Sequence, residues 1–282
     1  MLRLAVSSTP EGRWLGKQAE AALNAAGVAC SLLEWRDAPQ HALLRGDADA
    51  VAIWLSDWPP AQGDEPVAVA AILSRAHPFD LLVWRPEAAD LRKDFFLKKE
   101  AVVLGATTLQ RAQIAEFRPD LHWEEPLLAL PEALQRLSQG AAEALITSEA
   151  AWHASGANLN GFQRAVLHPR ECTPAPGQGA LALLARRDDK PTRQWLQRAH
   201  QPALSACTNV ERRLLREIQK HWPGAIFSAY VEQGANRTFH FFTAVVWPNG
   251  CLQRYRLSHS THAEFVEQTL RHFQESSDYS RT

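Results

Sequence analysis

Short apolar runs alternate with helix-patterned segments along the first two thirds of this 282-residue chain. Leu2 to Val6, Val28 to Trp35 and Ala50 to Leu55 have the character of strands, and the third is almost continuously apolar, as strands buried on both faces are. Between them lie an Ala-rich amphipathic segment, Arg13 to Ala26, and a short helical segment, His41 to Leu44. This β-α-β-α-β order predicts a doubly wound α/β domain with a parallel sheet.

The same alternation restarts at Asp80 and predicts a second α/β domain of similar size. The expected strands are Leu81 to Trp84, Ala101 to Leu104 and Glu143 to Thr147. The expected helices are Leu109 to Phe117 and Pro131 to Ser138, the latter with a proline in its first turn.

The pattern changes after Pro174-Ala-Pro-Gly-Gln-Gly. An apolar strand and three helices are expected at Ala180 to Ala185, Asp189 to His200, Val210 to Lys220 and Thr261 to Phe273. Three extended runs separated by Gly-containing turns, 226–232, 238–247 and 251–258, predict a small α+β domain with a three-stranded antiparallel sheet. We expect three domains: residues 1–76 with 177–198, residues 77–176, and residues 199–282, the last ending in a frayed polar tail from Glu275.

Charge and cysteine content exclude several functional classes. Thirty basic and thirty-one acidic residues give a net charge of −1, which argues against a general nucleic-acid or membrane-surface binder. The four cysteines have no CxxC spacing, and the histidines show no HxxxH or HxH pairing, so we expect neither a disulfide framework nor a metal site. No secretory signal or membrane span is apparent, and we expect a cytoplasmic monomer with a small-molecule ligand.

One strand-to-helix junction, Gly105-Ala-Thr-Thr-Leu-Gln-Arg, has two interpretations. The hydroxyls of Thr107 and Thr108 at a helix N-terminus, with Arg111 on the first turn, suit a carboxylate or phosphate. The alternative is an ordinary threonine N-cap.

Two further positions are candidate ligand contacts. Asp57 follows the strand that ends at Leu55, and ligands of open parallel sheets bind beyond the carboxyl ends of strands. Gln178, between two glycines, could present its amide to a ligand. Asp57 could equally be a solvated turn residue, and the glycines could serve a plain interdomain crossover.

Several segments, in order along the chain, resemble the hydroxymethylbilane synthase (porphobilinogen deaminase) family. Pro174-Ala-Pro-Gly-Gln-Gly-Ala resembles the family's "PAxGQGA" and is the most specific match. The others are Leu2-Arg-Leu-Ala with Thr9-Pro, Leu55-Ser-Asp-Trp-Pro for "KDVP", Arg75-Ala-His-Pro-Phe-Asp for "REDPRD", Gly105-Ala-Thr-Thr-Leu-Gln-Arg for "GTSSLRR", Thr208-Asn-Val-Glu-Arg for "TAER" and Ser228-Ala-Tyr for "GAY".

The resemblance implies three α/β domains, the first two like periplasmic binding proteins. It implies condensation of four porphobilinogen molecules, with release of ammonia, on a covalently attached dipyrromethane cofactor. Asp57 matches the family's catalytic carboxylate. The positions implied to contact substrate or cofactor are Thr9, Ser56, Thr107, Thr108, Arg111 and Gln178.

The chain also departs from the family pattern. Pro223 lies near the position of the cofactor-bearing cysteine, so covalent attachment is not expected; Cys172 is an alternative attachment point. Cationic positions of the family are occupied by Ser7, Ser56 and Gln110, the segment 124–132 is acidic and leucine-rich, and the loop expected between Trp35 and His41 is short.

These observations leave two functional classes open. One is a divergent hydroxymethylbilane synthase of tetrapyrrole biosynthesis. The other is a catalytically inactive relative, a pseudoenzyme, that binds a tetrapyrrole precursor, another small ligand or a protein partner. Ten tryptophans, four of which lie at Trp54, Trp58, Trp123 and Trp222, either provide stacking surface for a ligand or fill space left by the shortened loop and missing cofactor.

Overall fold

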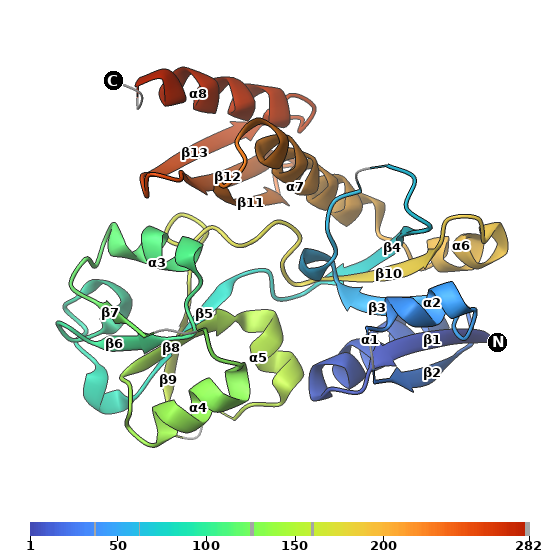
Figure 1. Cartoon of the computed structure of the whole chain (residues 1–282), viewed down its shortest axis with the longest axis horizontal. Coiled ribbons are helices and arrows are strands. Elements are labelled where there is room, and N and C mark those ends of the chain that lie inside the picture. The colour runs from blue at the N-terminus through green and yellow to red at the C-terminus, as the bar shows by residue number, and fades with distance from the viewer. Residues whose placement is uncertain (37, 62, 125–126, 159–160, 280–282) are drawn as a thin grey trace. The chain divides into compact units, whose positions relative to one another are not determined.

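The computed structural model describes residues 1–36, 38–61, 63–124, 127–158 and 161–279 (Figure 1). Contacts divide the chain into two compact units. The first unit comprises residues 1–78, 153–157 and 177–206, and the second comprises residues 79–152, 158–176 and 207–282. The three-domain division stays a prediction. No helix in the described ranges is long and apolar enough to cross a membrane.

The first unit contains a mixed five-stranded sheet in the order β2-β1-β3-β10-β4. Its strands are β1 (Leu2–Ser7), β2 (Cys30–Trp35), β3 (Ala50–Trp54), β4 (Val67–Arg75) and β10 (Ala180–Arg186). β1 is parallel to β2 and β3, as the sequence predicts, but β10 is antiparallel to both β3 and β4. The prediction of a parallel sheet is therefore wrong for this half, and β4 is a strand that the sequence analysis missed.

Three helices accompany this sheet: α1 (Pro10–Ala25), α2 (Gln40–Arg45) and α6 (Lys190–Gln197). α1 begins where Thr9 caps it and buries Leu15, Ala19 and Leu23, which recur at helical spacing along one face. A short 3-10 turn, η1 (Leu55–Asp57), follows β3 directly and places Asp57 beyond the carboxyl end of that strand.

The second unit has its own mixed five-stranded sheet, in the order β7-β6-β8-β5-β9. Its strands are β5 (Asp80–Trp84), β6 (Val102–Leu104), β7 (His122–Trp123), β8 (Ala144–Ser148) and β9 (Gln163–Val166). Its helices are α3 (Thr108–Ala115), α4 (Leu130–Ser138) and α5 (Glu149–Ser155), whose last residues cluster with the first unit. β5 runs antiparallel to β8 and β9, whereas β6 is parallel to β7 and β8.

The predicted small α+β region lies in the second unit and has the expected antiparallel order β11-β12-β13. Its elements are β11 (Ile226–Gln233), β12 (Phe239–Val246), β13 (Leu252–His259), α7 (Pro202–His221) and α8 (Phe265–Tyr279). Phe241, Phe265 and Phe273 are fully buried in the core that these elements share. α8 continues to Tyr279, so the predicted tail from Glu275 is wrong up to that residue; residues 280–282 lie outside the described part.

With its two mixed α/β sheets and its antiparallel C-terminal sheet, the structure confirms the predicted fold class.

Within the second unit, Arg254 of β13 connects the C-terminal sheet to the residues around α3 by hydrogen bonds. Its guanidinium donates to the backbone oxygens of Gln113 (3.1 Å) and Glu171 (2.9 Å) and to the carboxylate of Glu116 (2.7 Å).

A buried arginine stabilises a turn of unusual backbone conformation in the second unit. Phe95 and Phe96 adopt positive φ angles of 57° and 58°, which non-glycine residues rarely do. Arg118, only 4% exposed, donates to the backbone oxygens of this turn at Asp94 (2.7 Å), Leu97 (2.8 Å) and Lys98 (3.0 Å). Its pairing with Asp120 (2.7 Å) holds the pKa of that carboxyl well below its ordinary value.

We predict that Arg118→Met lowers the free energy of unfolding by about 3 kcal/mol or more, because it leaves a carboxylate and three carbonyls without their donor. Arg92→Met is the matched control, since Arg92 pairs with Asp90 through a side chain that is 89% exposed. Urea denaturation of both variants checks this. Equal stabilities would show that the turn does not depend on Arg118.

Candidate functional site

Asp57 lies on η1, immediately after the buried strand β3. Its carboxylate accepts a hydrogen bond from the Ser56 hydroxyl (3.3 Å). The residue keeps contact with solvent, yet the surrounding protein raises the pKa of Asp57, because loss of hydration disfavours the charged form. Perturbed carboxyl groups of this kind are typical of functional sites.

A second carboxylate, which the sequence analysis did not identify, lies in the first turn of α1. Glu11 accepts a hydrogen bond of 2.5 Å from the indole nitrogen of Trp54. Burial raises the pKa of Glu11, and the negative charge of Asp57 raises it further. The sequence did contain one signal, because Glu11 directly follows the Thr9-Pro10 helix start. Since α1 begins where β1 ends, Glu11 lies at the same edge of the sheet as Asp57.

The electrostatic setting of these two carboxylates differs from an arginine-rich pocket. Neither Glu11 nor Asp57 forms an ion pair with any of the described residues; their partners, Trp54 and Ser56, are neutral. The ring of Trp14 lies 5.7 Å from that of Trp54, centroid to centroid. This edge of the first unit therefore combines two acids with indole surface.

Two of the three threonines predicted as ligand contacts, Thr9 and Thr107, serve as helix caps. The Thr9 hydroxyl accepts from the Gly12 backbone nitrogen (3.1 Å), and Thr107 forms a capping box with Gln110. The side-chain oxygen of Gln110 accepts a hydrogen bond from the backbone nitrogen of Thr107 (2.8 Å). Thr108 begins α3 with an exposed side chain. The N-cap interpretation is correct for Thr107, and an anion site there stays a prediction.

Arg111, the cation predicted to contact a ligand at this junction, forms hydrogen bonds with backbone oxygens of the protein. Its guanidinium donates to the backbone oxygens of Ala106 (3.1 Å) and Glu124 (3.5 Å). Arg136 forms an ion pair with the Glu124 carboxylate. Residues 125–126 of the acidic segment 124–132 lie outside the described part, as does residue 37 of the shortened loop.

Gln178 and its flanking glycines form a tight crossover within the first unit. The Gln178 amide donates to the Pro78 carbonyl (3.1 Å), and the Gln178 carbonyl accepts from Arg75 (2.9 Å). Gly179 has a φ of +71°, and a Cβ there would lie 2.2 Å from the His77 oxygen. The motif therefore has a packing role, whatever else its amide contacts.

Cys172 is an unsuitable nucleophile in this structure. It is fully buried, and its thiol donates to the Asp80 carboxylate (3.3 Å). Burial and the charge of Asp80 raise the pKa of Cys172 well above its ordinary value, so the reactive thiolate is disfavoured. Pro223 lies in the turn between α7 and β11, where no thiol is present.

The tryptophans noted in the sequence pack mainly against cores. Trp54 is 7% exposed, Trp58 packs against the core of the first unit, and Trp123 packs against that of the second. Trp222 makes an edge-to-face contact with Trp247 (5.5 Å) in the C-terminal core. These contacts favour the space-filling interpretation for Trp123 and Trp222.

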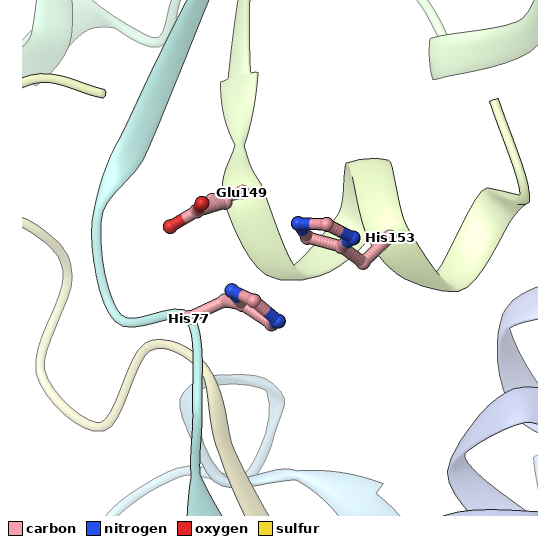
Figure 2. A group of neighbouring side chains, drawn as sticks. All are labelled: His77, Glu149 and His153. Atoms are coloured by element: carbon pink, nitrogen blue, oxygen red, sulfur yellow. The ribbon is translucent and has the colours of Figure 1, made fainter. Parts of the chain in front are cut away.

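A further group of side chains has ligand atoms suitable for a metal ion. The imidazoles of His77 and His153 and the carboxylate of Glu149 are neighbours, with one ligand atom of each within 4.8 Å of the others (Figure 2). The sequence analysis predicted no metal site, because it considered only pairs of histidines.

Asp57 beyond the carboxyl end of β3 is typical of α/β proteins that bind small ligands at the edge of a sheet. Residues 34–194 match the family model "Porphobilinogen deaminase, dipyromethane cofactor binding domain". This chain belongs to the porphobilinogen deaminase family.

Relatives and solved structures give the extent of the similarity. The porphobilinogen deaminase of Chloroherpeton thalassium (strain ATCC 35110 / GB-78) is 30% identical over 207 residues, 73% of this chain and 63% of that protein. That of Xylella fastidiosa (strain 9a5c) is 32% identical over 208 residues, 67% of this chain and 60% of that protein. The chain thus spans less than two thirds of their length. A nutrient binding protein from Burkholderia cenocepacia bound to methionine aligns with 79% of this chain and 98% of its own, at 13% identity and a TM-score of 0.45.

We predict that thiol reagents modify Cys251 first, because it is the exposed cysteine, on the turn between β12 and β13. Cys30 is half-buried with a raised pKa and should react more slowly, and Cys172 and Cys207 should react only on unfolding. Timed maleimide labelling with peptide mass analysis measures the order. Cys251→Ser should remove the fast phase; rapid labelling of Cys172 in folded protein would contradict the prediction.

Proposed function

We propose that this chain acts in tetrapyrrole biosynthesis as a pyrrole-binding member of its family, with Asp57 as the group that contacts the pyrrole nitrogens. The observation that carries this proposal is the position of Asp57, which matches the family's carboxylate and stands beyond the carboxyl end of β3 with a raised pKa. A carboxylate there can accept pyrrole N–H bonds and can balance positive charge on a bound pyrrole.

We further propose that no dipyrromethane is covalently attached. The turn that contains Pro223 supplies no thiol, and the buried Cys172 favours its protonated form. The residues present therefore do not fit the family's covalent cofactor, and a pyrrole ligand here is held by non-covalent contacts alone.

The loss of cations from the family pattern supports binding of a ligand with few carboxylates. Ser7, Ser56 and Gln110 are neutral where the resemblance implies cations, and Glu11 adds a negative charge. Each missing contact to a charged group removes about 1.5–3 kcal/mol of binding free energy. A growing pyrrole chain gains carboxylates at every step, so these losses accumulate. We therefore propose binding without four-step condensation, which makes the chain a pseudoenzyme.

A divergent synthase is the second candidate. The retained Asp57 favours it, since the family's reaction uses that carboxylate. In such an enzyme the primer would be held non-covalently. Consumption of porphobilinogen by the wild-type protein, abolished in Asp57→Ala, would establish this candidate and overturn the pseudoenzyme proposal.

Freshly purified protein should have the mass of the unmodified 31.5-kDa chain and give no colour with Ehrlich's reagent. The reason is that no accessible thiol occupies the attachment turn. Intact-mass spectrometry measures this directly, and a family member that carries the cofactor is the positive control. An added mass equal to two pyrrole units would contradict non-covalent binding.

Binding of porphobilinogen should strengthen as pH rises through the raised pKa of Asp57, because the ionised carboxylate is the acceptor. Asp57→Asn should weaken binding about tenfold or more. Quenching of tryptophan fluorescence measures binding, and Asp64→Asn, in an exposed position, is the control. Identical profiles for wild type and Asp57→Asn would remove Asp57 from the site.

A further inference from the structure

We propose that Arg170 and Arg256 form a binding site for a phosphate group, as the free ion or on a small phosphorylated molecule, beside the C-terminal sheet. Arg170 lies in the segment that follows β9, and Arg256 lies on β13, so both belong to the second unit. Both residues are exposed, which leaves the site open to an ion in solution. Guanidinium groups suit phosphate because their parallel N–H donors pair with two of its oxygens at once.

The strand geometry of β13 brings the arginines together. Arg254 and Arg256 are two residues apart on this strand, and side chains at that spacing lie on the same face of a sheet. Both guanidiniums donate to one oxygen, the backbone carbonyl of Arg170, at 3.3 Å from Arg254 and 3.0 Å from Arg256. Three arginines therefore meet at one place on the second unit.

Arg254 is fully engaged with the protein. Its Nε donates to the Glu116 carboxylate (2.7 Å), and its terminal nitrogens donate to the Gln113 side chain (3.2 Å) and to the backbone oxygens of Gln113 (3.1 Å), Arg170 (3.3 Å) and Glu171 (2.9 Å). A guanidinium has five N–H donors, so each of these donors has an acceptor. Arg254 contributes positive charge to the site, but its donors are already used.

Arg256 and Arg170 retain donors for a ligand. Among the described residues, the acceptor of the Arg256 guanidinium is the Arg170 carbonyl, and none accepts from the Arg170 side chain. The Glu116 carboxylate, whose charge favours ionised Arg256, is already paired with Arg254. Most N–H donors of the two exposed guanidiniums therefore remain for an anion.

The charge of this cluster indicates the charge of its ligand. Partial loss of hydration lowers the pKa of Arg256, and the positive charges of Arg254 and Arg170 lower it further. Like charges held together cost free energy until an anion offsets them. A phosphate group carries a charge of about −1.5 to −2 at pH 7 and so balances two guanidiniums from a single tetrahedral centre. A monocarboxylate balances one of them.

Titration of inorganic phosphate into the full-length protein at low ionic strength, measured by calorimetry, tests the proposal. We expect one ion per chain, with binding weakened at least about tenfold in each of Arg170→Gln and Arg256→Gln, because each removes charge-assisted hydrogen bonds. Arg256→Lys should bind phosphate more tightly than Arg256→Gln, since lysine keeps the charge without the planar fork. Arg271→Gln, which removes an exposed arginine of α8, is the control and should leave the affinity unchanged.

Three further ligands identify the chemical class. Binding of glycerol 3-phosphate indicates a phosphorylated molecule, and its exclusion indicates the free ion. Acetate should bind at least about tenfold more weakly than phosphate, because it balances one charge. Succinate that bound as tightly as phosphate would overturn the assignment to phosphate.

Stoichiometry and the variants decide whether the site exists. Circular dichroism identifies any variant that fails to fold, in which case the wild-type titrations and Arg256→Lys decide. Absence of stoichiometric phosphate binding, or equal affinities in wild type and both glutamine variants, would overturn the proposal. Neither result bears on Asp57, which belongs to the first unit.

Discussion

The first sheet depends on a close backbone contact between two crossover segments. Gly179 can approach the His77 carbonyl only because it lacks a Cβ and adopts a positive φ. This contact leads directly into β10, which inserts between β3 and β4 and is antiparallel to both. Without it, β3 and β4 would lose their shared neighbour, and η1 with Asp57 would lose Gly177, which packs against Leu55. The same contact restrains the backbone of His77.

Much of this architecture could be predicted from the sequence, for identifiable reasons. β1, β2, β3 and the C-terminal strands are bounded by turn residues and have clear apolar patterns, so their positions were correct within a few residues. The direction and neighbours of β10 could not be predicted, because its partners lie more than a hundred residues earlier and only tertiary packing selects them. β4 was missed for the same reason, and α7 was predicted eight residues too short at its start, at Val210 rather than Pro202.

Some residues of the candidate site could likewise be proposed from the sequence, whereas others could not. Asp57 could be proposed from the sequence because a strand end and a family motif coincide there, and Gln178 because a glycine motif marks it. Glu11 was not found, since a glutamate in the first turn of a helix is ordinary until the fold brings Trp54 beside it. The group of His77, Glu149 and His153 was missed because Glu149 and His153 carry no signal until α5 is known to be a helix.

The two carboxylates argue for a change in what this family member recognises. A polycarboxylate requires cations. In the second unit, Arg111 donates to the backbone oxygens of Ala106 and Glu124. Among the described residues of the first unit, the hydrogen-bond partners of Asp57 and Glu11 are neutral. Negative charge here repels acetate and propionate groups and attracts an amine or a ring N–H. In our proposal, the carboxylate that would contact a pyrrole nitrogen is retained, whereas the cations that would hold an elongating polyanion are not. These residues agree with our proposal that the chain binds one small pyrrole without assembling a four-ring chain.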